Sequence, residues 1–300
     1  MKTLLVVGCS PVWERGMRFE SLEMGEVNRA AEHWEYPSGK ATNLCRAIQC
    51  RAGDDCHAIL LTCLGGRRGG RFQEACREEG LFFQAVECRG ETRVCTNLVT
   101  PQGMTELVEE ASPLSPEEGS RFLETLEQCL PDADGVALAG NFPPHTPEAF
   151  PREIARRVAA RKMPLFLDNW RHFEAMSEVC PNLVLKINRG ELGRLVPRLP
   201  LPEAMVALAE HHPGLVLGVT DGPQEAWLLT PGRKAPLPFP VPPAKPLVNP
   251  LGAGDTASGV FFADLLCGMP PEKAFLRALQ AASLSCQTLK AGEFHPEDGK

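Results

Sequence analysis

The sequence predicts an α/β fold, a doubly wound three-layer sandwich, and two patterns support this prediction. Short, almost continuous apolar runs are typical of strands that are buried on both faces of a parallel sheet. Six such runs occur: Thr3–Val7, Ala58–Thr62, Gly135–Ala139, Pro164–Leu167, Leu183–Ile187 and Leu215–Val219. Amphipathic segments separate them, and this alternation implies helices on both faces of the sheet. A chain of 300 residues suits one large domain with a small appendage.

Helix start signals mark several of the amphipathic segments. Ser115-Pro116-Glu117-Glu118 is a capping box with proline at the first helical position, and it opens a helix to about Leu130. Thr146-Pro147-Glu148 opens another helix, which extends to about Arg161. Pro270-Pro271-Glu272 opens the last long helix. Proline suits the first position of a helix because it has no N–H, and an N–H at that position would have no intrahelical partner.

Two segments interrupt the alternation and are rich in β-strand signals. Residues 10–38 contain no clear helix. Within residues 86–110, the segments Thr92–Thr100 and Met104–Glu109 are predicted strands around a turn at Pro101-Gln102-Gly103. The proline-rich residues 232–247 are expected to form an extended surface segment or an edge strand.

Composition and charge exclude several classes of protein. The formal net charge of −7 argues against a nucleic-acid or anionic-membrane partner. No apolar run approaches the ~20 residues of a membrane span, and the run before Cys9 is too short for a signal peptide. The 12 cysteines include no Cys-x-x-Cys pair, so we expect reduced core thiols in a cytoplasmic protein.

The most informative stretch joins a glycine-rich turn to a helix. Gly252-Ala253-Gly254 precedes Asp255, and an apolar helix follows over Val260–Cys267. Free N–H groups at a helix N-terminus favour an anion, and glycines let the anion approach them. A carboxylate in the first turn could take a hydroxyl proton, so the turn suits phosphoryl transfer to an alcohol. The alternative is an ordinary helix start, with glycines for packing and Asp255 as a dipole partner.

This turn resembles the D-x-x-G-A-G-D signature of the ribokinase-like (PfkB-type) carbohydrate kinases, and the resemblance extends over nearly the whole chain. It implies a small β-sheet lid over the sugar site, and the lid is often used for dimer contacts. We therefore expect a homodimer through the lid. The expected parts are an α/β core of residues 1–9, 39–85 and 111–300 and a lid of residues 10–38 and 86–110.

A second motif resembles the first signature of the family, G-G-K-G-x-N. Gly39-Lys40-Ala41-Thr42-Asn43 matches it, with Ser38 and Ala41 in place of two glycines. The resemblance implies that Gly39 and Asn43 contact sugar hydroxyls and that Lys40 reaches a substrate phosphate. The alternative is a loop with a capping polar residue.

Two arginines resemble those of the hexose-phosphate kinase branch, which contains 1-phosphofructokinase and tagatose-6-phosphate kinase. Arg93 stands in the strand segment Glu91–Asn97, and Arg29 in the segment Gly25–Ala30. The resemblance implies that both hold the phosphate of the sugar, for which a guanidinium fork is suited. The alternative for Arg93 is an exposed strand arginine.

Two further substrate residues depart from the family pattern. Glu14 takes the place of an Asp in N-P-a-x-D, and Asn141 takes the place of the second Ser in S-G-S-L-P-P. The resemblance implies that both contact sugar hydroxyls. Because both side chains are longer than those of the family, they leave the identity of the sugar open.

The nucleotide side is expected from two strand ends. Lys186 stands near the end of one buried strand, and the N-x-x-E motif Asn188–Glu191 follows that strand. Thr220 and Gly222 follow the next strand. The resemblance implies that these residues bind ATP, and that Asn188 and Glu191 hold Mg²⁺ through water. Mg²⁺ on phosphates commonly keeps several waters. The alternative for Asn188 and Glu191 is a helix cap.

The resemblance also bears on monovalent cations. In several members of the family, Asp and Thr at the positions of Asn249 and Pro250 help to bind an activating K⁺. Neutral Asn249 lacks the formal charge that such a cation needs, and Pro250 lacks a backbone N–H. We therefore expect little dependence on K⁺.

Together these features predict an ATP-dependent kinase that phosphorylates a ketohexose phosphate, with Asp255 as general base and Gly252, Ala253 and Gly254 as the anion hole. Two alternatives stay open. One is a kinase for an unphosphorylated sugar or nucleoside. The other is a non-catalytic relative that senses a sugar or nucleotide, although such a protein would not need a base.

Overall fold

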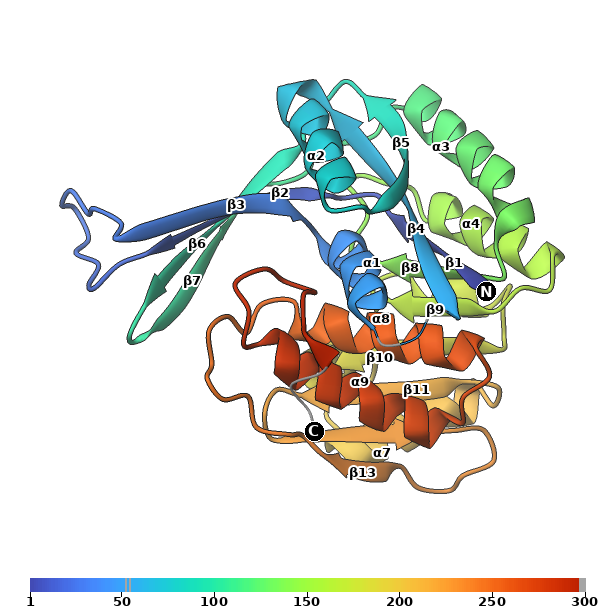
Figure 1. The fold of residues 1–300 in the computed structure, drawn as a ribbon. Helices are drawn as coiled ribbons and strands as arrows, with labels where there is room; N and C mark the ends of the chain where they lie inside the picture. The colour runs from blue at the N-terminus through green and yellow to red at the C-terminus, as the bar shows by residue number, and fades with distance from the viewer. Residues whose placement is uncertain (52, 54, 297–300) are drawn as a thin grey trace.

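A nine-stranded sheet forms the centre of the protein, and helices pack on both of its faces (Figure 1). The computed structural model describes residues 1–51, 53 and 55–296. The strand order is β13-β12-β11-β10-β9-β8-β1-β4-β5. The bounds of the strands are β1 Lys2–Gly8, β4 Cys56–Gly65, β5 Phe82–Cys88, β8 Gly135–Ala139, β9 Leu165–Asp168, β10 Leu183–Asn188, β11 Val216–Asp221, β12 Glu225–Leu229 and β13 Leu237–Pro240.

The strands from β5 to β11 in this order are parallel, and β12 and β13 join antiparallel at one edge. All six predicted runs are strands of this sheet, so the doubly wound sandwich is confirmed. Strand order reverses beside β1, which pairs with β4 on one side and with β8 on the other. The carboxyl ends of strands at such a switch point commonly form the ligand site. The proline-rich segment contains the edge strand β13, as one of its two expected states.

The helices begin close to the predicted signals. Ser115 caps α3 through a complete capping box with Glu118, and α9 begins at Pro271. The helix that follows Thr146-Pro147-Glu148 begins at Ala149. The bounds of the helices are α1 Lys40–Cys50, α2 Gly66–Glu78, α3 Pro116–Cys129, α4 Ala149–Ala160, α5 Phe173–Ser177, α6 Arg189–Leu195, α7 Leu201–His211, α8 Ala253–Leu266 and α9 Pro271–Ser285, with a 3₁₀ turn at Leu130–Asp132.

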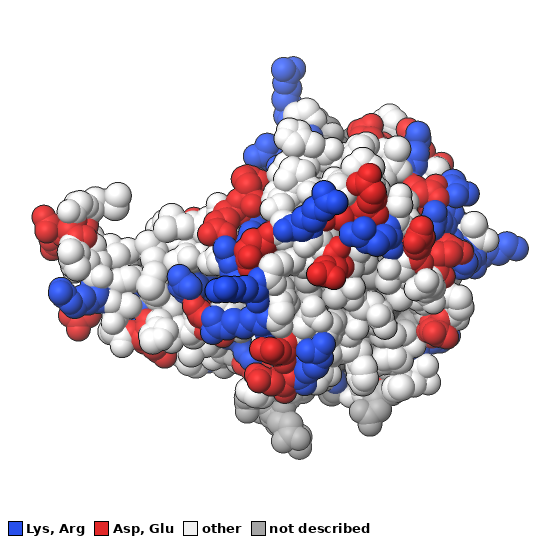
Figure 2. Space-filling view, turned by 90° about the horizontal axis from the view of Figure 1, so that it is seen from above, with Lys and Arg blue, Asp and Glu red and all other residues white. Residues whose placement is uncertain are grey.

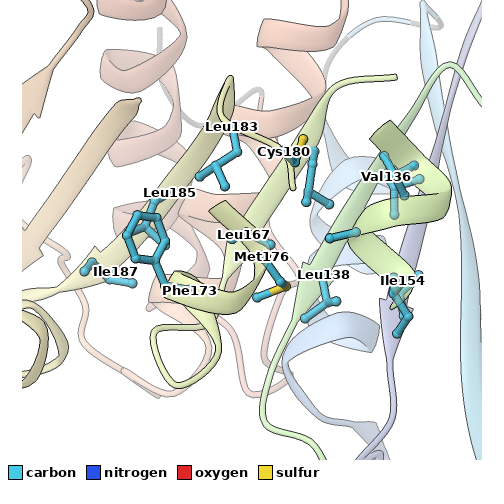
Figure 3. Close-up of a cluster of buried hydrophobic side chains, with 14 of the residues drawn as sticks. Val136, Leu138, Ile154, Leu167, Phe173, Met176, Cys180, Leu183, Leu185 and Ile187 are labelled. Carbon is cyan, nitrogen blue, oxygen red and sulfur yellow. The ribbon is translucent and has the colours of Figure 1, made fainter. Parts of the chain in front are cut away.

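Two hydrophobic layers hold the sandwich together, one on each face of the sheet. Figure 3 shows part of the first layer, in which Leu138 and Leu167 of the sheet pack near Ile154 of α4 and Met176 of α5. The second layer joins the opposite face to α1, α2, α8 and α9, and it contains the fully buried Phe261 of α8. Because α8 is buried almost all round, the position of its N-terminus is fixed by the core.

A separate four-stranded sheet forms the lid, in the order β3-β2-β6-β7. It comprises β2 Val12–Arg18, β3 Glu32–Ser38, β6 Arg93–Thr100 and β7 Gly103–Val108, so both β-rich segments are confirmed as strands. The lid projects from the core in Figure 1. The core sheet extends to Cys88, because β5 pairs with β4 over its full length; the expected lid segment 86–110 therefore begins inside a core strand.

The surface carries charges of both signs (Figure 2), and the cysteines are unpaired. On the face shown in Figure 2, Lys and Arg side chains are interspersed with Asp and Glu, both on the lid and on the core. All 12 cysteines are free thiols, and most are buried. Within the described ranges, no helix combines the length and the apolar character that a bilayer span requires.

Candidate active site

The predicted residues converge at the carboxyl ends of the central strands, where α1, α6 and α8 begin. Gly252 caps α8 with a left-handed φ of 74°. A Cβ built on Gly252 would lie 2.5 Å from Cβ of Ala291, so both the backbone angle and the space require glycine. Asp255 lies in the first turn of α8, as predicted. The turn therefore presents free helix N–H groups beside a carboxylate.

Asp255 is held by α1. Nδ2 of Asn43 donates a hydrogen bond of 2.8 Å to Oδ2 of Asp255. Burial and then the charge of Asp168 raise the pKa of Asp255 above its ordinary value, whereas Lys40 and Asn43 oppose this rise. A carboxylate with a raised pKa is a stronger base, so this environment suits proton abstraction.

A cluster of opposite charges lies beside Asp255. Nζ of Lys40 is 2.8 Å from Oδ1 of Asp168 and 3.3 Å from Oε1 of Glu191. Buried Lys186 donates to the carbonyl of Gly254 at 2.9 Å, which ties β10 to the turn before Asp255. Burial acts to raise the pKa of Asp168, but Lys40 and Lys186 outweigh it and hold that pKa low. Asp168 therefore carries a charge within the site.

Asp168 is the main residue that the sequence interpretation missed. It is 2% exposed at the end of β9, and it also accepts a hydrogen bond of 2.5 Å from Oγ of Ser258 on α8. A signal was available, since Asp168-Asn169 directly follows the apolar run Pro164–Leu167. Polar residues at the carboxyl end of a parallel strand commonly face the ligand site.

Asn188 and Glu191 form a complete capping box at the start of α6. The structural alternative from the sequence is therefore present. Oε2 of Glu191 accepts the hydrogen bond of the cap, from the N–H of Asn188. Its other oxygen, Oε1, accepts from Nζ of Lys40 and belongs to the charged cluster. Both residues thus cap a helix, and Glu191 also faces the site.

A cavity of about 470 Å³ extends from the N-terminus of α8 to the turn after β11. Thr220 and Gly222 line it together with Ala253 and Gly254, so the structure brings these predicted residues to one pocket. Its opposite wall is apolar, with Val241 and Leu279 among others. A polar, glycine-rich end and an apolar wall match the phosphates and the base of a nucleotide.

Glu14 lies buried at the base of the lid. Nδ2 of Asn97 on β6 donates to Glu14, and Ser38 is a second partner. Burial and the charge of Glu106 raise the pKa of Glu14 to about 7. Nearby, Gly39 caps α1 with φ of 104°, and an added Cβ would lie 3.3 Å from Cα of Pro11.

Arg93 also stands at the base of the lid, at the first position of β6. Its Nη1 donates to the carbonyl of Glu109 at 3.1 Å, while its Nε is buried and has no hydrogen-bond partner among the described residues. It lines a small cavity together with Ser10 and Pro11. An unpartnered buried donor of a guanidinium is compatible with an absent anion.

Asn141 is exposed and follows Gly140 at the end of β8. A Cβ on Gly140 would lie 3.5 Å from Cβ of Lys40, so this turn lies against the first turn of α1. The turn that carries Asn141 therefore lies next to Lys40 of the charged cluster.

Arg29 is the exception among the predicted site residues. It is exposed in the connection between β2 and β3, beyond the pair Arg18 and Glu32 that ends this hairpin. The hairpin base is at Val12 and Ser38, about 20 Å away at ~3.3 Å per residue. Within one chain, Arg29 therefore cannot join the other residues, because the hairpin is extended and carries it outward (Figure 1).

The residues near α6 fit Mg²⁺ only through water. In the part of the chain that the structure describes, no three His, Cys, Asp or Glu side chains are grouped to hold a metal ion. Few carboxylates and much water are normal for Mg²⁺ that is bound mainly to phosphates. Glu191 and Asn188 present oxygens of the required type at this edge of the sheet.

Comparison with models of protein families shows to which family this chain belongs. The model of the pfkB family carbohydrate kinases matches residues 6–298. The chain belongs to the PfkB family of carbohydrate kinases. Its lid, its sandwich and its Gly-Ala-Gly-Asp turn are the parts of this PfkB kinase that the sequence resemblance implied. Kinases of this family use ATP.

Individual relatives cover almost the whole PfkB chain. It is 28% identical over 298 residues to 1-phosphofructokinase of Bacillus subtilis (strain 168), with 96% of this chain and 94% of the relative covered. A crystal structure of phosphofructokinase-2 from Escherichia coli with potassium matches with a TM-score of 0.86 at 19% identity, covering 99% and 97% of the two chains. The complex of that enzyme with fructose-6-phosphate matches with a TM-score of 0.80 at 20% identity, covering 97% and 96%.

Proposed function

We propose that this PfkB kinase transfers the γ-phosphoryl group of ATP to a hydroxyl of a ketohexose phosphate, of the fructose 1-phosphate or tagatose 6-phosphate type. The observation that carries the proposal is the position of Asp255 in the first turn of α8, directly after the Gly252–Gly254 turn. A base and an anion site are then within one helical turn of each other.

The chemical step follows from this arrangement. Asp255 takes the proton of the acceptor hydroxyl, the oxygen forms a bond to the γ-phosphorus, and the bond from that phosphorus to the bridging oxygen of ADP breaks. The N–H groups of Gly252, Ala253 and Gly254 face the negative charge of the phosphoryl oxygens. The raised pKa of Asp255 favours its role as a base.

ATP occupies the cavity of about 470 Å³ in this proposal. Thr220 and Gly222 hold its phosphates from one side. Lys186 supports the Gly252–Gly254 turn through its hydrogen bond to the carbonyl of Gly254. Asn188 and Glu191 hold Mg²⁺ through water, and this ion would neutralise phosphate charge when bound. Lys40 stands between Asp168 and Glu191 and supplies a positive charge at the boundary between nucleotide and acceptor.

The acceptor binds between the lid and α1. Glu14, Gly39, Asn43 and Asn141 contact its hydroxyls, and Arg93 holds its phosphate together with Lys40. The unpartnered Nε of Arg93 supports this assignment, since a phosphate would supply the missing acceptor. The similarity to a 1-phosphofructokinase supports a hexose phosphate as the substrate class.

Arg29 would reach a phosphate only from a second copy of the chain. The lid exposes large apolar side chains, with Met24 at 99% and Val27 at 78% exposure, and Leu107 and Val108 at 53% each. Such a surface favours contact between proteins. We therefore keep a homodimer through the lid as part of the proposal, in a protein of the cytoplasm whose thiols stay reduced.

Two other functions use the same fold. A kinase for an unphosphorylated sugar or nucleoside would not need the phosphate contacts of Arg93. A sensor that binds a sugar or nucleotide without turnover would not need Asp255. The hydrogen bond from Asn43 to Asp255 favours the catalytic alternatives, because it orients the carboxylate.

A screen of acceptors tests the proposal. ADP release by the purified protein is measured with ATP, Mg²⁺ and a set of free and singly phosphorylated ketohexoses, and the Asp255→Asn variant is the control. We expect a phosphorylated ketohexose to give the highest kcat/KM. Higher efficiency with a free sugar or nucleoside would replace the proposal by the first alternative, and ligand binding without ADP release would favour the sensor.

A further inference from the structure

Beyond the residues that the substrates would touch, we propose that Arg46 is a positioning residue of this site: it fixes the side-chain amide of Asn43 so that Nδ2 faces Asp255. The inference rests on the proposed function only in so far as Asp255 is called a base. Arg46 is 4% exposed and lies on α1, one turn after Asn43.

Each nitrogen of the Arg46 guanidinium has a partner, and the partners come from different parts of the fold. Nη1 donates to Oδ1 of Asn43 at 3.1 Å and to the carbonyl of Ala291 at 2.5 Å. Nη2 donates to the carbonyl of Pro37 at 2.7 Å, and Nε donates to Glu79 at 2.9 Å. The guanidinium also lies over the ring of buried Tyr36, 5.6 Å from its centroid.

The chemistry of arginine decides which end of the Asn43 amide faces Asp255. A guanidinium has donors and no acceptor, so the atom of Asn43 that it contacts must be the oxygen. Oδ1 also faces the hydroxyl of Ser38 at 3.1 Å. The opposite end, Nδ2, then donates to Asp255 at 2.8 Å. A flipped amide would set N–H against N–H at Arg46 and oxygen against the carboxylate at Asp255.

The second acceptor of Arg46 links it to the anion hole. The carbonyl of Ala291 is held by Nη1, and Ala291 packs against Gly252, where an added Cβ would lie 2.5 Å from the Cβ of Ala291. The next residue, Gly292, packs against the backbone of Asn43, since a Cβ on Gly292 would lie 2.3 Å from its carbonyl oxygen. Arg46 thereby holds the segment that separates Asn43 from the start of α8.

The third acceptor links Arg46 to the lid. The carbonyl of Pro37 belongs to the end of β3, directly before Ser38 and Gly39. Arg46 thus joins the base of the lid, the amide that orients Asp255 and the segment behind the anion hole. Substitution of Arg46 should therefore change the chemistry at Asp255 without removing any proposed contact to a substrate.

The purely structural alternative is that Arg46 only neutralises Glu79. The chain supplies a matched control in Arg51, which follows the same helix and whose side chain is 2% exposed. Arg51 pairs with Asp264 at 2.6 Å and with Asp55 at 2.7 Å, at the end of α1 opposite to Asn43. Arg51→Met therefore removes a buried arginine at the end of the same helix, without a contact to Asn43 or Asp255.

The test compares Arg46→Met, Arg46→Lys, Asn43→Ala and the control Arg51→Met in the full chain. The first readout does not require activity: the pKa of Asp255 is followed by ¹³C NMR of its carboxyl carbon. Charges that face Asp255 from the other elements, those of Asp168, Lys40, Lys186 and Glu14, are unchanged in all four variants. We expect the pKa to rise by about half a pH unit or more in Arg46→Met and Asn43→Ala, and to stay constant in Arg51→Met.

Steady-state kinetics provide the second readout. We expect kcat to fall by about 10- to 100-fold in Arg46→Met, with KM for ATP within about threefold, and to recover partly in Arg46→Lys. In an Asn43→Ala background, Arg46→Met should lower kcat by less than about threefold more, since both substitutions remove the same orientation.

Three outcomes would overturn the inference. The first is that Arg46→Met and Arg51→Met change the pKa of Asp255 and kcat equally, and the second is that the pKa of Asp255 is unchanged in Arg46→Met. The third is that the double variant loses kcat by the product of the factors measured for Arg46→Met and Asn43→Ala. If Arg46→Met does not fold, Arg46→Lys and Asn43→Ala carry the same comparison. If the wild-type protein phosphorylates no sugar, the proposed function fails, but the NMR result still decides the role of Arg46.

Discussion

Nδ2 of Asn43 lies 2.8 Å from Oδ2 of Asp255, although 212 positions separate the two residues in the chain. Asn43 stands in the first turn of α1 and Asp255 in the first turn of α8. The hydrogen bond therefore connects the two motifs that were most informative in the sequence. It forms only when the two helices pack side by side on the same face of the sheet.

Asp255→Asn should abolish most turnover while it preserves the fold. Asn is almost the same size, but it cannot accept the proton of the acceptor hydroxyl. Loss of a general base typically costs about 10²- to 10⁴-fold, and we expect kcat to fall by at least this factor. The measurement is kcat by ADP release, with nucleotide affinity by calorimetry as the control. Turnover within about threefold of wild type would contradict the role of Asp255.

Arg93→Ala should remove most of the preference for a phosphorylated sugar. The loss of a charged hydrogen-bonding partner costs roughly 1.5–3 kcal/mol, or about 10- to 150-fold in kcat/KM. The matched control is Arg68→Ala, because Arg68 also contacts Glu109, at 3.0 Å from Oε2, but does not line the cavity that Arg93 lines. kcat/KM is compared for a ketohexose and its phosphate. Equal efficiency of wild type with both sugars would show that no phosphate pocket exists.

Lys40→Met should move the acid limb of the kcat profile to higher pH. The positive charge of Lys40 lowers the pKa of Asp255, against the effects of burial and of Asp168. Without that charge, Asp255 holds its proton up to a higher pH, and only the deprotonated form is a base. The profile is measured from pH 5 to 8 with saturating substrates. An acid limb that stays in place, or that moves to lower pH, would show that Lys40 does not act on Asp255.

Glu14→Gln should stabilise the protein at high pH and have no such effect at low pH. Burial raises the pKa of Glu14 from 4.5 to about 7. Because the folded pKa is the higher one, stability associated with this group is present below pH 4.5 and is lost as the pH rises to 7. At ~1.36 kcal/mol per pH unit, Gln should raise the free energy of unfolding at pH 8 by up to about 3 kcal/mol.

Urea unfolding of wild type and Glu14→Gln at pH 4 and pH 8 measures this difference. Asn97 keeps an oxygen acceptor in the variant, so the comparison isolates the charge. A variant that is less stable than wild type at pH 8 would show that Glu14 is stabilised as a carboxylate. Catalytic efficiency should fall in the same variant, since Glu14 is a proposed ligand of the sugar.

Activity should depend little on K⁺. Nδ2 of Asn249 donates to the carbonyl of Leu289 at 2.8 Å, and Oδ1 accepts from the N–H of Leu251 at 3.0 Å. The amide thus joins two loops beside Gly252 through its own hydrogen bonds, and it contributes no negative charge. Initial rates are compared at fixed ionic strength with K⁺ exchanged for a bulky ammonium ion. A many-fold rise with K⁺ would show that backbone carbonyls form a cation site despite the neutral side chain.

Much of the fold could be predicted because its signals are local. A buried parallel strand needs a short apolar run, and each of the six predicted runs became a strand. The cap at Ser115 and the turn at Gly252 depend on residues that are neighbours in the chain. For the same reason, the sequence placed Asp255 in the first turn of a helix.

The arrangement of the site depended on the tertiary structure. Asp168 meets Lys40 only because β9 and α1 end at the same edge of the sheet, and no local pattern pairs residues that are 128 positions apart. Arg29 was assigned to the phosphate from the sequence, but an extended hairpin carries it away from the site of its own chain. Arg46 gave no signal, because its acceptors are carbonyls and side chains brought together by packing. Local turns and strands depend on neighbouring residues, so they can be predicted from the sequence. The charges and amides that meet at Asp255 depend on how distant elements pack, so they become visible in the folded structure.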